Sequence, residues 1–514
     1  MAARMSKVFK SKIKEIENVS EGYDRRWLAQ DHLVAQFGLP GDILAVSFDQ
    51  IQSLLAVATS KSIHVLGQNG VESVYQVAAG REVAHLLIHG SHLIAIDTKH
   101  VLYTWLIEDK TRDPAVIQPL RGVVTATYAE ASIDWLFLGM KDGTVSVWDI
   151  EGEQIVPSFK IKNQYFERQE DWRLMGEVYA VPRYHISPVI QLCLHPLDLG
   201  ILLIVYADGA CLYSLKEGTT KTFYECIFPD GTELTVQKPP LTCATFSPDG
   251  RFVLLGCNDG SLAFFDVSDG EIPLQVRSLE QADINMSNPP ASNRLHYNPI
   301  TSLRWCCRVE PSDSFLLVAG GLPADIDGLT VLDYGMTPSK AQELSEFFGT
   351  PQRHKILPIS RAQVLDLLPL GTASPFHMSH DPRCVLILAA NGHVTTLEVP
   401  DGRPVSIGAL PPSISICSPP ISDYTVGRLP QHVITHLSER THTEIREKSL
   451  LAGGALRATR QQGERTGTVL CTVHEGTMLR IFDIVHDLIV KPPITEIDTT
   501  LTMPNTYCFK FHAG

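Results

Sequence analysis

The sequence predicts an all-β fold, and three observations carry this prediction. Short runs rich in β-branched and aromatic residues recur along the chain, and turn residues separate each run from the next. The longest apolar runs, such as Ile201–Tyr206, have the length of a strand and fall far short of the roughly 18 residues that span a membrane. The 36 glycines and 33 prolines supply the many turns that a chain of short strands needs.

The pattern of strand, turn and strand is clearest around residues 135–150. Trp135–Met140 and Thr144–Ile150 have strand composition, and Asp142-Gly143 lies between them. An Asp-Gly pair accepts the positive φ of a tight hairpin turn, so the two runs are predicted to pair. The second run contains Trp148-Asp149, a dipeptide that often closes one blade of a WD40 propeller.

Similar units recur through the whole chain. A fifth unit has the turn Ser247-Pro248-Asp249-Gly250, in which proline presets φ and Asp-Gly allows the reversal. Later turns contain Asn391-Gly392 and Glu475-Gly476. In order, the predicted units span residues 43–67, 83–106, 123–150, 189–215, 244–267, 300–334, 364–399 and 468–484.

No single unit of this kind can bury both of its faces, so neighbouring units must stack or close into a ring. We therefore predict a seven-bladed WD40-like β-propeller followed by the start of a second propeller. The predicted domains are an N-terminal lead-in, 1–36, a first propeller, 37–450, and an incomplete second propeller, 451–514. Long insertions between units are predicted at 151–188, 216–240, 268–299, 335–363 and 400–466, with a short helix at Ala341–Phe348.

Composition excludes several classes of function. The net charge of −14 argues against nucleic-acid binding, because that affinity comes largely from Lys and Arg. The 11 cysteines include no Cys-x-x-Cys, so neither a zinc site nor a disulfide framework is indicated. No run is long enough for a transmembrane segment. We expect a cytoplasmic protein with reduced thiols, whose attachment to any membrane is peripheral.

The lead-in has two interpretations. Phe9, Ile13 and Ile16 follow helical spacing, and Lys7, Lys10, Lys12 and Lys14 make the same stretch basic. The stripe could form a helix that binds a membrane surface or a partner. It is short, however, and Glu15 and Glu17 weaken the lipid interpretation, so we favour a solvated lead-in.

No catalytic, cofactor-binding or metal-binding residue is assigned, and the chain is predicted not to be an enzyme. It lacks nucleotide-binding fingerprints and the zinc-protease and serine-hydrolase motifs. The histidines that come near a ligand spacing are expected to be unremarkable loop residues: His377, His380, His432, His436 and His442. Asp149, Asp266 and Asp483 are expected to fix turns, and Trp148, Phe265 and Phe482 to pack between blades.

Two stretches at the first unit resemble a known family. Phe48–Thr59 and Ile63–Glu72 are similar to the opening blade of the lethal giant larvae, tomosyn and yeast Sro family, and His474–Asp483 resembles a later segment of it. Gln50 and Ala58 depart from the residues usual in that family. Members have two propellers and longer chains, so we interpret this chain, which ends soon after its eighth unit, as a shortened form.

The resemblance implies a non-catalytic scaffold. Members bind plasma-membrane SNARE proteins of the syntaxin and SNAP-25 type and regulate vesicle docking in polarised exocytosis, on the route from the Golgi to the plasma membrane. It further implies contacts with Rab-type GTPases and myosin, a regulatory effect on GTPases and a part in cell polarity. No residue of a family binding motif maps onto this sequence. The alternatives are a WD40 adaptor in ubiquitin ligation or cytoskeletal regulation, and a propeller enzyme for which the sequence offers no candidate residues.

Overall fold

The fold is described from a computed structural model of the whole chain. The description covers residues 38–498 apart from 69–70, 110, 169–186, 227, 231–234, 238, 271, 281–296, 324–325, 327, 360–361, 372–378, 404, 406–410, 417–420, 431, 435, 437–466, 475–477, 486–487 and 490–494. The predicted lead-in at 1–36 therefore lies outside the described residues, as do His377 and His442.

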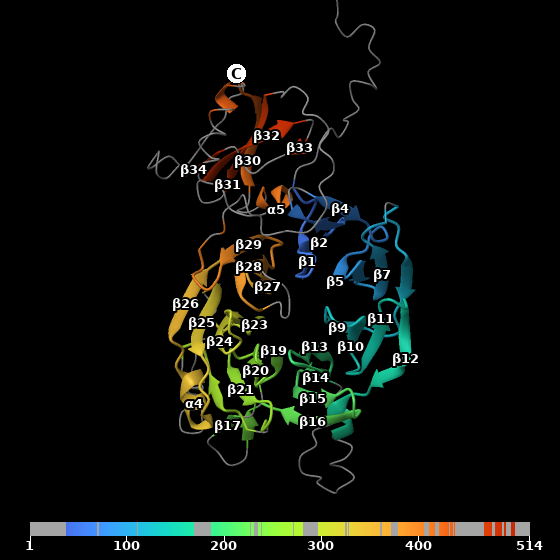
Figure 1. Cartoon of the computed structure of the whole chain (residues 1–514), viewed down its shortest axis with the longest axis vertical. Helices are drawn as coiled ribbons and strands as arrows, with labels where there is room; N and C mark the ends of the chain where they lie inside the picture. The colour runs from blue at the N-terminus through green and yellow to red at the C-terminus, as the bar shows by residue number, and fades with distance from the viewer. Residues whose placement is uncertain are drawn as a thin grey trace, which may run out of the picture.

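Seven antiparallel sheets follow one another along the chain, and we call them blades 1 to 7 (Figure 1). Within a blade the strands pair in the order of the sequence. Blade 1 contains β1 (Ile43–Asp49), β2 (Leu54–Thr59), β3 (Ile63–Leu66) and β4 (Glu72–Tyr75). Blade 2 contains β5 (Val83–His89), β6 (His92–Asp97), β7 (Val101–Leu106) and β8 (Val116–Pro119). Blade 3 contains β9 (Val124–Ala129), β10 (Trp135–Met140), β11 (Val145–Asp149) and β12 (Gln154–Ile161).

The remaining blades repeat this order. Blades 4 and 5 contain β13 (Val189–His195), β14 (Asp198–Tyr206), β15 (Gly209–Ser214) and β16 (Thr219–Tyr224), then β19 (Leu241–Phe246), β20 (Phe252–Cys257), β21 (Leu262–Asp266) and β22 (Gln275–Arg277). Blades 6 and 7 contain β23 (Ser302–Cys307), β24 (Asp313–Ala319), β25 (Gly328–Met336) and β26 (Arg353–Pro358), then β27 (Val364–Gly371), β28 (Pro382–Ala389) and β29 (Val394–Glu398). A small hairpin of β17 (Phe228–Asp230) and β18 (Thr235–Gln237) precedes blade 5.

The blades close into a ring, because a separate apolar core fills the space between each blade and the next. The last of these cores joins the two ends of the ring: Leu386 and Leu388 of blade 7 pack in one cluster with Leu55 and Val57 of blade 1. All six residues of β2 are buried, since neighbouring blades cover both faces of this strand. The predicted seven-bladed β-propeller is confirmed.

The outermost strands correct the sequence prediction. β12, β16, β22 and β26 lie in segments that the sequence assigned to insertions between blades. In blade 7 the outer position holds only a short stretch, where the backbone N–H of Glu398 donates to Arg403 O at 2.7 Å and that of Val405 donates to Thr396 O at 3.3 Å. Within the described residues, every strand of the ring pairs inside its own blade, so closure uses no strand exchanged from the other end of the ring.

The turn at Asp142-Gly143 shows why this sequence folds locally as predicted. Gly143 has a φ of +79°, and a Cβ there would lie 1.9 Å from Nδ2 of Asn163. A side chain is therefore excluded both by the backbone conformation and by the neighbouring loop. The Asp142 carboxylate accepts the backbone N–H of Thr144 at 3.0 Å, which fixes the start of the next strand.

The insertion after β25 forms the predicted short helix, α4 (Ala341–Gly349). Leu344 and Phe348 on its apolar face are buried, and they pack in one core with Phe264 and Trp305 of blades 5 and 6. At the end of the helix, the buried Arg277 donates to the carbonyl oxygens of Phe348 and Gly349 at 3.2 and 3.0 Å. A cation here complements the negative end of the helix dipole and satisfies two of its terminal carbonyls.

An eighth sheet follows the ring and stands beyond its edge, next to blades 7 and 1 (Figure 1). It is reached through the short helix α5 (Pro412–Ser415) and contains β30 (Ile421–Arg428), β31 (Thr468–His474), β32 (Met478–Val485), β33 (Leu488–Ile489) and β34 (Thr495–Asp498). The boundary predicted at residues 450 and 451 divides this sheet, because β30 comes before it and pairs with β31 after it. That the sheet begins a second propeller stays a prediction.

Candidate functional site

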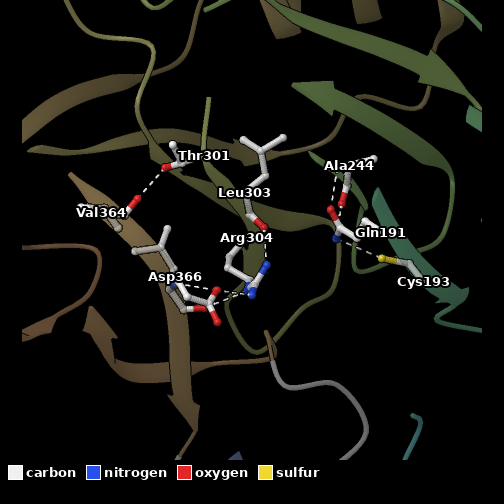
Figure 2. Close-up of polar contacts among 9 residues, drawn as sticks. Gln191, Cys193, Ala244, Thr301, Leu303, Arg304, Val364 and Asp366 are labelled. Atoms are coloured by element: carbon white, nitrogen blue, oxygen red, sulfur yellow. Dashed lines mark hydrogen bonds and ion pairs between the residues drawn. The ribbon is translucent and has the colours of Figure 1, made fainter. Parts of the chain in front are cut away.

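The blades of a propeller surround a central channel, where function is often located. In this ring the first strand of each blade lies nearest the centre (Figure 1). In blades 4, 6 and 7 these strands carry polar or charged side chains within largely apolar runs, among them Gln191, Arg304 and Asp366. Figure 2 shows how these side chains bridge neighbouring blades.

Gln191 joins blade 4 to blade 5. Its Nε2 donates to the carbonyl oxygen of Ala244 at 2.8 Å, and its Oε1 accepts the backbone N–H of the same residue at 3.0 Å (Figure 2). The side-chain amide thus pairs with the next blade as another strand backbone would. Nε2 also lies 3.3 Å from the sulfur of Cys193.

Arg304 joins blade 6 to blade 7. Its Nη2 lies 2.7 Å from Oδ1 of Asp366, and its Nε donates to the carbonyl oxygen of Leu367 at 2.8 Å (Figure 2). Thr301 adds a further bond across the same boundary, from its hydroxyl to the carbonyl oxygen of Val364 at 2.8 Å. We call Arg304, Asp366 and Thr301 the channel clasp.

Neither of the two groups best suited to chemistry in the channel is in a reactive form. Burial, with repulsion from His100 as a smaller contribution, lowers the pKa of His85 to about 4, so the ring is uncharged at neutral pH. Burial raises the pKa of Cys193 to about 11, so its thiol stays protonated. The channel side chains described here therefore hold the ring together.

Replacing Arg304 with methionine tests how much the channel clasp stabilises the ring. The Arg304→Met variant keeps the apolar stem but loses the bonds to Asp366 and to Leu367 O. Because both charged side chains are partly exposed, the expected loss in the free energy of unfolding is only about 1–2 kcal/mol. Urea denaturation followed by tryptophan fluorescence measures it.

The matched control is Arg251→Met, because Arg251 is exposed and, among the described residues, forms no ion pair that joins two blades. Its guanidinium lies over the edge of the core, 4.9 Å from the ring centroid of Phe252. This control is expected to change the unfolding free energy by less than about 0.5 kcal/mol. Equal effects of the two substitutions would show that the channel clasp contributes nothing beyond an ordinary surface arginine.

Blade 1 contains a chain of hydrogen bonds that the sequence interpretation missed. Ser62 Oγ lies 2.7 Å from Nε2 of His64, and Nδ1 of His64 lies 2.6 Å from Oε1 of Glu72. The hydrogen bond with His64 is the main reason that the pKa of Glu72 is lowered. Ser413 of α5 donates to the second Glu72 oxygen at 3.3 Å, which ties the approach to the eighth sheet to the ring.

The order of these groups, hydroxyl, imidazole and carboxylate, is that of a serine hydrolase. The Ser62 hydroxyl is nevertheless buried, with the residue only 6% exposed. A second pair of this kind, Thr472 with His474 at 2.8 Å, is buried in the eighth sheet. In both places a hydroxyl two residues before a histidine gives the buried imidazole a hydrogen-bond partner. A Ser or Thr at this spacing from a histidine is the sequence pattern that could have predicted these pairs.

Asp149 and Asp266 act as predicted, whereas the prediction for Asp483 is wrong because this residue lies inside a strand and not at its end. Asp149 accepts the backbone N–H of Gly152 at 2.8 Å, and Asp266 accepts that of Ser268 at 2.8 Å. Asp483 lies in β32, and its Oδ1 is buried without a hydrogen-bond partner in the described part of the chain. The aromatic residues also pack as predicted: Trp148 against blade 2, Phe265 against blade 4, and Phe482 in the core of the eighth sheet.

Of the histidines singled out by their spacing, the structure describes His380, His432 and His436. Nε2 of His380 lies 3.0 Å from the carbonyl oxygen of Val309, and His432 and His436 are exposed. Across the described residues, no group of three or more His, Cys, Asp or Glu side chains is placed to hold a metal ion. The described helices also include none that is long and apolar enough to cross a membrane.

These features define a β-propeller in which polar side chains of the first strands join neighbouring blades. No protein-family model matches the chain. An uncharacterized protein of Schizosaccharomyces pombe is 33% identical over 410 residues, which are 76% of this chain and 40% of that protein. The lethal(2) giant larvae protein homolog SRO77 of Saccharomyces cerevisiae is 27% identical over 516 residues, 94% of this chain and 48% of that protein.

The chain belongs to the lethal giant larvae and Sro family, as the stretches at Phe48–Thr59 and Ile63–Glu72 predict. It spans less than half the length of these two relatives. A chain in the crystal structure of a mitotic checkpoint complex aligns with 74% of this chain and 97% of its own length, at a TM-score of 0.46 and 13% identity.

Proposed function

We propose that this protein is a non-catalytic scaffold that binds SNARE proteins of the syntaxin and SNAP-25 type and regulates vesicle docking and fusion in polarised exocytosis. The observation that carries the proposal is the similarity to the lethal(2) giant larvae homolog, which extends over 94% of this chain. The fold is consistent with it, since a rigid ring holds its surface turns in fixed positions for a partner.

The interior of the ring supports a role without catalysis. Cys193 carries a protonated thiol, the Ser62 hydroxyl is buried, and the Arg304 guanidinium bonds to blade 7. A propeller of this kind acts by holding a SNARE segment in or out of a fusion complex. We place it in the cytoplasm and peripherally at the plasma membrane, with Rab-type GTPases and myosin as further partners.

Direct binding tests the proposal. The purified 514-residue chain is titrated with the cytosolic parts of a syntaxin-type and a SNAP-25-type protein from the same organism, and binding is followed by interferometry. We expect a dissociation constant of about 1 μM or below for at least one of them, the range of a specific interface. The SRO77 homolog serves as the reference protein.

Absence of binding up to about 100 μM, roughly 5 kcal/mol of affinity, would contradict the proposal if SRO77 binds in the same assay. The alternative function is that of an adaptor in ubiquitin ligation or cytoskeletal regulation. Proximity labelling in cells separates the two, because an adaptor of that kind is expected to label its own complex and no exocytic proteins.

A further inference from the structure

Charge is unevenly distributed between the two faces of the ring. Because the strands of a blade alternate in direction, the turns that join its first and second strands and its third and fourth strands emerge on the same side. We call this side the acidic face. Its exposed carboxylates include Glu108, Asp134, Glu151, Asp198, Glu217 and Glu310.

Among the described residues, exposed cations on the acidic face are fewer than exposed carboxylates, and they include Arg112, Lys216, Arg251 and Lys340. Arg308 forms ion pairs with Asp313 at 2.7 Å and with Asp333 at 2.8 Å. The turns of the opposite face, in contrast, expose Lys61, Lys99 and Lys141 in three successive blades. Among the described residues, exposed carboxylates therefore outnumber exposed cations on the acidic face.

Apolar side chains stand among these carboxylates close to the mouth of the channel. Ile51, Leu197 and Val309 are 60%, 69% and 70% exposed. All three lie in turns after the innermost strands of their blades, and the next residues after Leu197 and Val309 are Asp198 and Glu310. A surface that combines exposed aliphatic tips with negative charge fits a segment that is both basic and apolar.

We propose that the acidic face binds the protein's own N-terminal segment, residues 7–16. This segment carries Lys7, Lys10, Lys12 and Lys14 for the carboxylates, and Phe9, Ile13 and Ile16 for the aliphatic tips. Residues 17–37 connect it to the ring and can reach about 70 Å when extended. That reach exceeds the height of the ring, since a seven-residue strand such as β1 is about 23 Å long.

The same electrostatics disfavour an anionic lipid surface or a nucleic acid, because both would be repelled by the acidic face. Two acidic faces would likewise repel each other, which disfavours a symmetric contact between two copies through this face. A tethered segment also has an advantage over a free partner, because its effective concentration at the face is high.

A zero-length carbodiimide reaction tests the proposal on the full chain, because it joins a lysine amine to a carboxylate only where the two touch. Mass spectrometry is expected to find links from Lys7, Lys10, Lys12 or Lys14 to Asp198 or Glu310. These links should exceed those to Asp142 and Asp259, exposed carboxylates of the opposite face, by at least about fivefold.

The matched variant combines Phe9→Ser, Ile13→Ser and Ile16→Ser, which keeps every lysine. Specific docking predicts that the links to Asp198 and Glu310 fall at least about fivefold, because the apolar contacts are lost. Unchanged links in this variant, or links spread evenly over both faces, would overturn the proposal. So would links found only between molecules when isotopically labelled and unlabelled chains are mixed, since the occupant would then be a second copy.

Discussion

Replacing Phe264 with alanine is expected to lower the free energy of unfolding by about 4 kcal/mol, as for a large aromatic residue in a tight core. Phe264 is fully buried, and its ring stacks on that of Phe348 with centroids 4.5 Å apart. The edge contacts to Trp305 at 5.8 Å and Tyr334 at 6.0 Å would be lost with it. Blade 5, blade 6 and α4 meet at this residue, so the cavity would affect all three.

Urea denaturation followed by the fluorescence of the six tryptophans, one of which is Trp305 in this core, provides the readout. Ile117→Ala is the control, since that side chain is 56% exposed and its removal should cost less than about 0.5 kcal/mol. A loss below about 1 kcal/mol for Phe264→Ala would mean that the core closes around the cavity, which contradicts tight packing between the two blades.

The Asp97→Ala variant is expected to cost about 3 kcal/mol, because it leaves several donors without a partner. Asp97 is fully buried, and it accepts the backbone N–H groups of Lys99 at 2.8 Å and Val101 at 2.9 Å. Nη1 of Arg81 lies 2.7 Å from its other oxygen. One carboxylate thus fixes both the turn after β6 and the loop that leads into β5.

The pH dependence of Asp97→Asn separates the charge from the hydrogen bonds. Burial alone would raise the pKa of Asp97, but the donors from Arg81, Val101 and Lys99 together lower it below the ordinary value. The carboxylate therefore stabilises the fold above the unfolded pKa of about 4, and this contribution is lost as the pH falls through the lower folded pKa.

The difference in unfolding free energy between the natural chain and Asp97→Asn is accordingly expected to be constant from about pH 5 to 8 and to shrink below about pH 4. Thermal denaturation over this range measures it. A difference that grows on acidification would mean that Asp97 is protonated in the folded protein.

Much of the ring could be predicted from the sequence, because its inner strands are buried on both faces. β10 begins and ends at the predicted residues, Trp135 and Met140, as an apolar run bounded by turn residues. The outer strands were missed for the opposite reason. β8 has the sequence Val-Ile-Gln-Pro and is mostly exposed, so neither hydrophobicity nor alternation marks it as a strand.

The contacts between blades depend on residues far apart in the chain, and composition alone does not reveal them. Arg304 and Asp366 are each the one charged residue of a largely apolar strand. This pattern indicates that each side chain needs a polar partner, but it does not indicate which residue the partner is. The Ser62, His64 and Glu72 chain was missed because Glu72 comes from the next strand. Patterns within one strand were predictable, whereas pairings across strands required the fold.

Among the described residues the ring closes without an exchanged strand, and this has a consequence for how the protein folds. Almost all backbone pairing in the ring is local, so each blade can form while its neighbours are still incomplete. The packing of Leu386 and Leu388 on Leu55 and Val57 is different, because it brings together the two ends of the ring. The entropy of closing that long loop makes this contact the expected last and slowest step, and the same seam is where the ring would open first under mechanical load.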